Sequence, residues 1–200
     1  MQIVLHRRNT LAELKATPTR FGVEVDVRSC GKELIVHHDP FRVGERFDDW
    51  IVAYQHKLLI LNTKEEGLEK RLTGLMENHG IEDFFFLDQS FPFLIKTARE
   101  GEDRCAVRVS EFEPIELALS LKGLVRWVWV DCFSGFPLTG GAAKTLQEAG
   151  MQLCLVSPEL QGRTHSSAIF ELREFLGSEK IKPEAVCTKR PDLWGDGHAI

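Results

Sequence analysis

The sequence predicts an α/β protein: a single compact (β/α)8 TIM barrel spanning residues 1–200, with short helices and a truncated C-terminal end. Three observations support this fold class. Eight β-branched or aromatic runs are spread along the chain, segments of helical periodicity separate them, and no linker divides the sequence. Strands that alternate with helices pair in parallel, and eight such units close into a barrel. Because such barrels usually have about 250 residues, this chain leaves room for short helices only.

The predicted strands are short apolar runs at residues 2–6, 22–28, 57–63, 83–88, 105–109, 125–131, 151–156 and 184–188. A further run at 33–38 follows the second strand after only a turn-like segment. We therefore expect it to form a hairpin-like extension of that strand. A doubly wound open sheet is the alternative arrangement of the same elements.

Three segments between the strands show the clearest helical periodicity, with apolar residues three and four positions apart: 68–76, 115–121 and 166–176. Gly80 is expected to stop the first of these helices. Pro114 stands where the second helix tolerates the missing N–H of proline.

The C-terminal end is not expected to form a full amphipathic helix, because Pro191, Gly195 and Gly197 interrupt it. The outer face of the first and last strands then lacks cover at Ile3 or Val4 and at Ala185 or Val186. A second copy of the chain covers this face in a homodimer, or the tail folds back through Leu193, Trp194 and Ile200.

The composition excludes several classes of partner. The chain has 25 basic and 30 acidic residues and a net charge of −5, without a basic stripe, so no nucleic-acid partner is expected. No apolar run approaches the roughly 20 residues of a membrane span, so no stable membrane anchor is expected. Five single cysteines and the absence of a leader-like segment before the first strand favour a reducing, cytoplasmic location.

Ionisable residues collect at the C-terminal ends of the predicted strands, where barrels place their reacting groups. Glu24 and Asp26 are two residues apart on an apolar strand and therefore share a face. Two carboxylates on a buried face repel each other unless a cation lies between them, and oxygen ligands suit Mg²⁺ or Ca²⁺. A solvated strand face, or an ion pair with Arg28 or Lys64, is the alternative.

Two histidines and an arginine lie at neighbouring strand ends. His6 and His38 have the side chain that best suits general acid and base roles near neutral pH. Arg7 offers a planar fork of donors that matches two phosphate oxygens. Together with the carboxylate pair, these residues indicate a site for a reacting phosphate.

Three motifs together resemble the glycerophosphodiester phosphodiesterases, a family that shares a barrel superfamily with the phosphatidylinositol-specific phospholipases C. They are His6-Arg7 after the first strand, Glu24-x-Asp26 on the second strand, and His38-Asp39-Pro40 after the extension. The segments LNTK at 61–64 and VCTKRPD at 186–192 extend the likeness, so the chain looks like a short, divergent member.

The resemblance implies metal-dependent hydrolysis of a small-molecule phosphodiester by a two-histidine mechanism. His6 and His38 would exchange protons with the substrate, and Arg7 would contact its phosphate. Glu24 and Asp26 would bind the divalent cation, Mg²⁺ or Ca²⁺.

The chain also departs from the family pattern. The loop after Arg7 is short at 8–10, where the family has a Gly and later a Pro-Glu-Asn-Thr segment. The third strand of the family reads Asn-x-Glu-x-Lys, but residues 62–66 read NTKEE, as though carboxylate and amine had exchanged places. Lys64 then occupies the position of the family's third metal-binding carboxylate and is expected to contact the phosphate. Glu66 is the expected replacement for that metal ligand.

The first function hypothesis is therefore a metal-dependent phosphodiester hydrolase. One alternative is a phosphodiester lyase that forms a cyclic phosphate without a tightly held metal, the Lys64 ammonium replacing part of the cation's charge. Another is a phosphate-binding relative with altered catalysis. Trp129 and Asp131, at the end of the sixth strand, are further predicted substrate contacts, with core packing as the alternative reading of the tryptophan.

Overall fold

The structure is a computed structural model that describes residues 1–195 and divides into two compact units. We call residues Val4–Arg104 the N-terminal unit. Residues Met1–Ile3 together with Cys105 onward form the C-terminal unit. Each unit is built from parallel strands and the helices that connect them.

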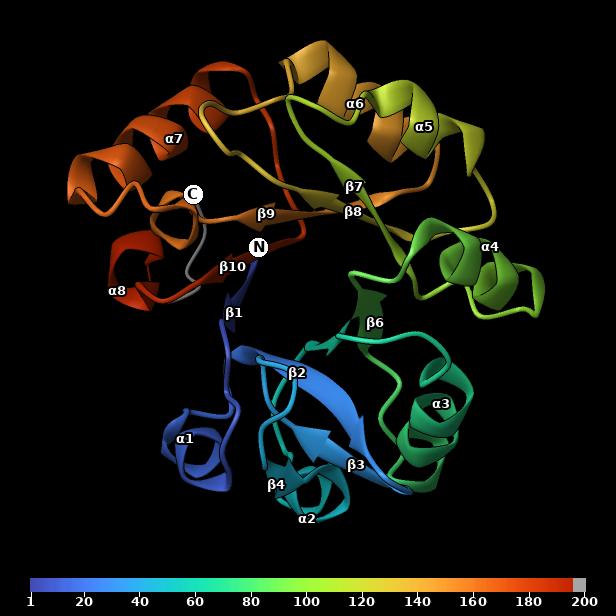
Figure 1. The fold of residues 1–200 in the computed structure, drawn as a ribbon. Helices are drawn as coiled ribbons and strands as arrows, with labels where there is room; N and C mark the ends of the chain where they lie inside the picture. The colour runs from blue at the N-terminus through green and yellow to red at the C-terminus, as the bar shows by residue number, and fades with distance from the viewer. Residues whose placement is uncertain (196–200) are drawn as a thin grey trace. The chain divides into compact units, whose positions relative to one another are not determined.

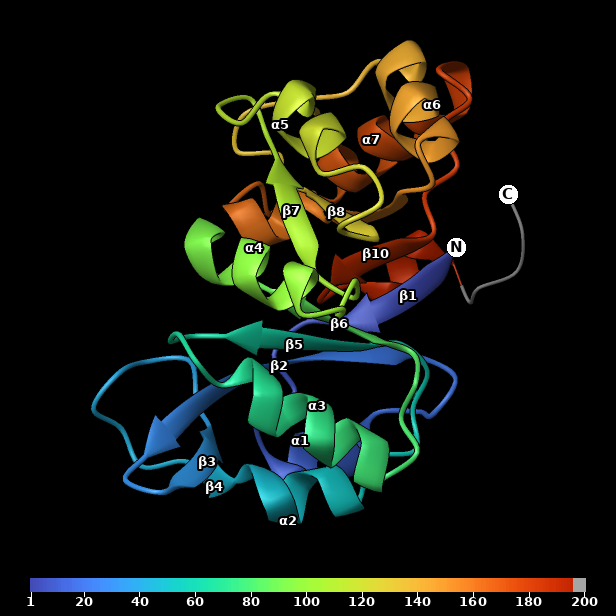
Figure 2. The same cartoon turned by 90° about the vertical axis from the view of Figure 1, so that its right-hand side faces the viewer.

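The N-terminal unit contains β1 (Gln2–Leu5, from Val4), α1 (Leu11–Ala16), β2 (Gly22–Cys30), β3 (Glu33–Val36), β4 (Glu45–Arg46), α2 (Phe47–Val52), β5 (Leu59–Thr63), α3 (Glu69–Asn78), β6 (Phe84–Leu87) and α4 (Phe91–Arg99). Its parallel strands lie in the order β1-β2-β5-β6. The register places Val4 beside Gly22 and Asp26 beside Asn62. Helices α1, α2 and α3 lie on one side of β2 and β5 (Figures 1 and 2).

Strand β3 pairs antiparallel with β2, with Val27 beside Val36, and β4 pairs antiparallel with β3. This confirms the hairpin-like extension of the second strand. The extension matters for the site because it carries the segment that follows Val36, which includes His37 and His38.

The C-terminal unit contains β7 (Ala106–Val109), α5 (Ile115–Ser120), β8 (Trp127–Val130), α6 (Gly140–Glu148), β9 (Gln152–Val156), a 3₁₀ turn η1 (Pro158–Gln161), α7 (Ser166–Ser178), β10 (Ala185–Thr188) and α8 (Pro191–Trp194). Its strands are parallel in the order β7-β8-β9-β10. Helices α5, α6 and α7 lie on one side of these strands (Figures 1 and 2).

All eight predicted strands are present, and so are the three helices expected from periodicity. Within each unit, the parallel strands lie side by side in the same order in which they follow one another along the chain. A doubly wound sheet would reverse this order partway through. The α/β class is confirmed, and the strand order is that of a TIM-like barrel. Closure of the complete (β/α)8 ring and a single domain over 1–200 stay predictions.

The core of each unit is aliphatic and aromatic. Phe84, Phe85 and Phe86 of β6 are all at most 1% exposed, so this strand is covered on both of its faces. A strand buried on both faces is typical of parallel sheets flanked by helices. No helix among residues 1–195 is long and apolar enough to cross a membrane.

The expected lack of cover at the first and last strands is wrong. Ile3, Val4, Ala185 and Val186 are all at most 2% exposed. The tail forms the short helix α8, whose Trp194 is 3% exposed and donates its indole N–H to Ser157 Oγ at 2.8 Å. The Arg173 guanidinium also donates to the Leu193 carbonyl at 2.6 Å, which fixes the tail on α7. Gly197 and Ile200 lie outside the described residues, and the homodimer stays a prediction.

Candidate active site

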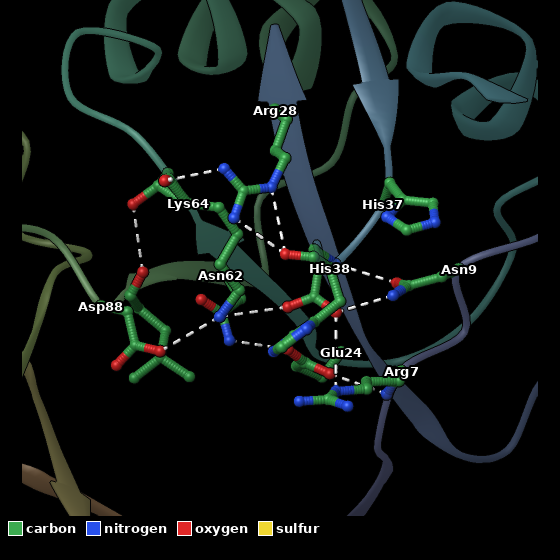
Figure 3. A network of polar contacts seen from close by, with 12 residues as sticks. Arg7, Asn9, Glu24, Arg28, His37, His38, Asn62, Lys64 and Asp88 are labelled. Carbon is green, nitrogen blue, oxygen red and sulfur yellow. Dashed lines mark hydrogen bonds and ion pairs between the residues drawn. The ribbon is translucent and has the colours of Figure 1, made fainter. Parts of the chain in front are cut away.

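Figure 3 shows Glu24 in a polar network of the N-terminal unit, and Asp26 belongs to the same network through its contacts with Asn9 and Lys64. Both side chains belong to β2, and because they are two residues apart they point to the same face of the strand. Both residues are 0% exposed, although Val23, Val25 and Val27 make the rest of the strand apolar. Two buried carboxylates must be compensated by donors and positive charges.

The negative charge of Glu24 is stabilised mainly by neutral hydrogen-bond donors. Its Oε2 accepts the Arg7 backbone N–H at 2.7 Å, and its Oε1 accepts the Asn62 side-chain amide at 2.9 Å. His6 Nε2 lies 3.8 Å from the same Oε2. Burial, with a further contribution from Asp26, raises the pKa of Glu24 to about 7. Near neutral pH the carboxylate pair therefore carries less than two full negative charges.

Asp26 is compensated by an amide and two cations. The Asn9 side chain donates to Oδ2 at 2.6 Å and accepts the Asp26 backbone N–H at 3.0 Å. The Lys64 ammonium lies 3.2 Å from Oδ1, and Arg7 Nε lies 3.7 Å from Oδ2. Asp26 therefore joins three segments of the unit at one point.

The short loop after β1 is fixed tightly in place. Arg7 has a φ of 52°, a left-handed conformation that costs a residue with a side chain on the order of 1–2 kcal/mol. The bond from its N–H to Glu24 and the reciprocal pair between Asn9 and Asp26 offset this strain. The Arg8 carbonyl also accepts the Trp50 indole N–H at 2.9 Å. The Arg7 side chain remains 40% exposed, which leaves its guanidinium accessible to a ligand.

His38 and its neighbour His37 have different roles in the segment after β3. His38 Nδ1 lies 2.8 Å from Asp39 Oδ1, and the hydrogen bond from His38 lowers the pKa of Asp39. Because an ionised carboxylate only accepts, His38 Nδ1 carries the proton and Nε2 is available to exchange one. His37 Nδ1 instead accepts the Asp39 backbone N–H at 2.9 Å, so this ring holds the turn.

Arg28 connects the segments that carry His38 and Lys64. Its Nε and Nη2 donate to the His38 carbonyl at 3.0 and 2.8 Å, and its Nη1 donates to the Lys64 carbonyl at 3.3 Å (Figure 3). A planar guanidinium can hold two carbonyls in one geometry in a way that a lysine cannot. Arg28 therefore positions both residues through their backbones.

Lys64 lies between two carboxylates. Its Nζ is 3.2 Å from Asp26 Oδ1 and 3.3 Å from Asp88 Oδ2 (Figure 3). Asp88 follows β6 with a φ of 61°, a second strained residue at the site. A cavity of about 320 Å³ adjoins Lys64 and Asp88. It is lined by Thr63, Lys64, Glu65, Glu66, Glu69, Asp88, Gln89 and Ser90.

The structure brings Lys64 to the carboxylate pair, and Glu66 lies farther out. Glu66 is exposed and contributes to the wall of the cavity. In the part of the chain that the structure describes, Glu66 does not form a group of three His, Cys, Asp or Glu side chains that could hold a metal ion. Its role as a metal ligand stays a prediction.

Trp129 and Asp131 belong to the C-terminal unit. Trp129 is 6% exposed on β8. Asp131 is 2% exposed; its Oδ2 accepts from Arg108 at 2.9 Å, and its Oδ1 accepts from the Gln161 side chain and the Cys132 backbone. Within this unit Asp131 joins β7 to the loops after β8 and β9. The predicted substrate contacts of Trp129 and Asp131 stay predictions.

Sequence reasoning missed the parts played by Asn9, Arg28 and Asn62. Asn9 follows a strand and precedes Thr10, which caps α1 in a box with Glu13, so a helix-start signal was present in the sequence. Arg28 was considered only as an ion-pair partner, whereas it binds carbonyls. No pattern in the sequence predicts which carbonyls a side chain will reach.

The divalent cation implied by the resemblance does not fit the donors around the carboxylate pair. Each of the four carboxylate oxygens of Glu24 and Asp26 already faces an N–H donor or an ammonium. Asp26 Oδ1 and Asn62 Oδ1 are buried without a hydrogen-bond partner, but the first faces the Lys64 ammonium and the second is a neutral ligand. Among residues 1–195, no three His, Cys, Asp or Glu side chains are arranged to hold a metal ion.

Comparison with known proteins gives a structural match. No family model matches the chain. No curated protein matches it in sequence either. The crystal structure of a glycerophosphodiester phosphodiesterase from Agrobacterium tumefaciens str. C58 is similar, with a TM-score of 0.66 and 15% sequence identity. The match covers 96% of this chain and 97% of that one. The chain therefore has the fold of a glycerophosphodiester phosphodiesterase, which supports the family that its motifs resemble.

Proposed function

We propose that the protein is an enzyme that cleaves small-molecule phosphodiesters, acting on a glycerophosphodiester or a similar alkyl or sugar phosphodiester. The observation that carries the proposal is the network around Glu24 and Asp26. It gathers a histidine and two cationic side chains after β1 and β5, the two strands that flank β2: His6, Arg7 and Lys64. The fold match adds support, because the similar structure is that of a phosphodiesterase.

In this proposal the phosphate binds through charge. A phosphodiester carries one negative charge, and further charge develops on its oxygens when a nucleophile attacks. The Arg7 guanidinium and the Lys64 ammonium are held by Asp26 before substrate arrives, so their orientation costs little at the moment of reaction. Positive groups fixed in this way stabilise the transition state more than the bound diester.

The two histidines transfer protons. One removes a proton from the attacking oxygen while its bond to phosphorus forms, and the other protonates the leaving alkoxide as its bond to phosphorus breaks. His38 is oriented for this role by Asp39, which leaves Nε2 as the reacting atom. His6 lies beside Glu24, with its Nε2 3.8 Å from the Glu24 Oε2 atom.

The test is turnover followed by ³¹P NMR on bis(p-nitrophenyl) phosphate and a panel of glycerophosphodiesters. We expect conversion of a diester to a phosphomonoester and an alcohol, and loss of this conversion in the His38→Ala variant. If the purified protein binds phosphate but converts none of the diesters, the proposal fails and the phosphate-binding alternative replaces it.

A phosphodiester lyase is the second candidate, favoured by the position of the Lys64 ammonium between Asp26 and Asp88. In this reaction a neighbouring hydroxyl of the substrate attacks phosphorus, a cyclic phosphodiester forms, and no water is consumed. The reaction in ¹⁸O-labelled water separates the two candidates. Hydrolysis places one label in the phosphomonoester, whereas the cyclic product carries none.

A further inference from the structure

We infer that the Lys64 ammonium takes the place of a divalent cation in this site, and that the protein folds and binds phosphate without one. This inference rests on the proposed function for its substrate class. It departs from the metal dependence that the family resemblance implies. Three observations on the N-terminal unit carry it.

The first observation is the place of the ammonium. Lys64 Nζ lies 3.2 Å from Asp26 and 3.3 Å from Asp88, and the side chain is only 14% exposed. A metal ion at these two carboxylates would need the same positions and would be repelled by the ammonium. Lys64 would have to leave both of its partners before a cation could enter.

The second observation is the side chain beside Asp26. Strand pairing puts Asn62 of β5 next to Asp26, and its amide donates to Glu24 at 2.9 Å. Hard cations such as Mg²⁺ and Ca²⁺ are held by several carboxylate or other oxygen ligands. The Asn62 amide donates an N–H to Glu24. An ionised carboxylate at position 62 could not donate such a bond.

The third observation is what the buried carboxylates hold. Through Glu24 and Asp26 the site fixes the Arg7 backbone, the Asn9 amide and the Lys64 ammonium. Glu24 and Asp26 therefore position the groups that would contact the phosphate. Asp26 Oδ1 makes no hydrogen bond, but the Lys64 ammonium supplies the positive charge opposite it, so the buried charge does not need a metal.

Metal binding is the first test. Thermal unfolding and calorimetry with millimolar Mg²⁺, Ca²⁺ or Mn²⁺, and with EDTA, are measured on the wild type and on the Asn62→Asp/Lys64→Met double variant. The double variant replaces an amide with a carboxylate of the same shape and removes the competing ammonium. We expect no shift in wild-type Tm and no binding heat, and a metal-dependent rise in Tm for the double variant. Saturable binding of any of these cations to the wild type would overturn the inference.

Phosphate binding in EDTA is the second test. Titration with inorganic phosphate and with glycerol phosphate is followed by calorimetry on the wild type, Lys64→Met and the control Lys70→Met. Lys70 is an exposed lysine of α3. We expect wild type and the control to bind equally and Lys64→Met to bind at least about tenfold more weakly. Circular dichroism confirms that each variant is folded, and equal binding by a folded Lys64→Met would overturn the inference.

Turnover in EDTA separates this inference from the proposed function. Turnover that persists in EDTA supports both. Turnover that stops in EDTA and returns with Mg²⁺ or Ca²⁺ overturns the inference and leaves the function standing. Phosphate binding in EDTA without turnover of any diester supports the cation-free site and refutes the proposed function.

Discussion

The N-terminal and C-terminal units are built on the same plan but use their buried polar groups differently. In the C-terminal unit, Asp131 is bonded to Arg108 and Gln161, and Glu159 accepts from Ser157, Thr188 and the Lys189 backbone. These groups satisfy one another and hold loops together. In the N-terminal unit, the buried Asp26 pairs with groups that stay partly exposed: the side chain of Arg7 is 40% exposed and that of Lys64 is 14% exposed. Under the proposed function, the chemistry therefore belongs to the N-terminal unit, and the polar groups of the C-terminal unit contribute to stability.

The largest expected effect is on the histidines. His6→Ala and His38→Ala should each lower kcat by about 10²- to 10⁴-fold, because each removes a proton-transfer group. Both side chains lie at strand ends and are partly exposed, so the fold should be retained. Steady-state kinetics on the best substrate, with circular dichroism of each variant, measures this.

The matched control is His79→Ala, which removes an exposed histidine at the C-terminal end of α3. It should leave kcat unchanged. If either His6→Ala or His38→Ala retains wild-type kcat, the two-histidine mechanism is wrong.

The second prediction concerns the C-terminal unit. Asp131→Asn should lower the free energy of unfolding by about 1–3 kcal/mol, because it breaks a buried, charge-assisted bond to Arg108. Urea denaturation measures the change, and kcat should stay close to wild type. A folded and equally stable variant with low kcat would be the opposite result and would show that Asp131 contacts substrate. The assignment of chemistry to the N-terminal unit alone would then be wrong.

The sequence predicts most of the fold because its strands are strongly patterned. The run FFFL of β6 is apolar at every position, and Leu72 and Met76 mark the buried side of α3, so local pattern and packing agree. The short helices α1 and α2, with six residues each, lack enough turns to show a period. The tail that folds back through Trp194 is one of two alternatives from the sequence, because a four-residue helix leaves no periodic signal that decides between them.

The carboxylate pair of the site follows from the sequence for a simple reason: two acids on an apolar strand point to one buried face. The partners of that pair follow only in part: the sequence offers Lys64 as an alternative ion-pair partner, but it does not indicate Asn62 or Asn9. Lys64, Asn62 and Asn9 reach Glu24 or Asp26 from β5 and from the loop after β1, and side-chain reach between segments depends on register and loop path. The metal that the resemblance implies stays a prediction, at carboxylates that an ammonium and two amides contact.

The third prediction sharpens the role of positioning in the N-terminal unit. Arg28→Lys should lower kcat/KM by about tenfold, because a lysine cannot hold the carbonyls of His38 and Lys64 together. The pH profile should keep its shape, since no titrating group is lost. Arg46→Lys is the control, because Arg46 pairs with the exposed Glu33 and the half-buried Asp48, which lie outside this network. Unchanged kcat/KM in Arg28→Lys would show that Arg28 is dispensable for the site.

The smallest expected effect concerns a loop of the C-terminal unit. Burial by itself would raise the pKa of Glu111, but the backbone N–H groups of Gly135 and Ser134, each at 2.7 Å, lower it from 4.5 to about 2. A carboxyl whose pKa is lowered by folding stabilises the protein above its unfolded pKa. That stabilisation is lost as pH falls from about 4.5 toward 2. Because Glu111 is exposed, the contribution should stay below about 1 kcal/mol.

Glu111→Gln tests this contribution, with urea midpoints measured at several pH values between 7 and 2. The variant should be less stable than wild type at neutral pH, and the difference should narrow as the wild-type carboxylate is protonated. Glu174→Gln, at an exposed position of α7, is the control and should match wild type throughout. A gap between wild type and Glu111→Gln that stays constant down to pH 2 would mean that shape, and not charge, fixes the Ser134–Gly135 loop, and the acid sensitivity assigned to this unit would be wrong.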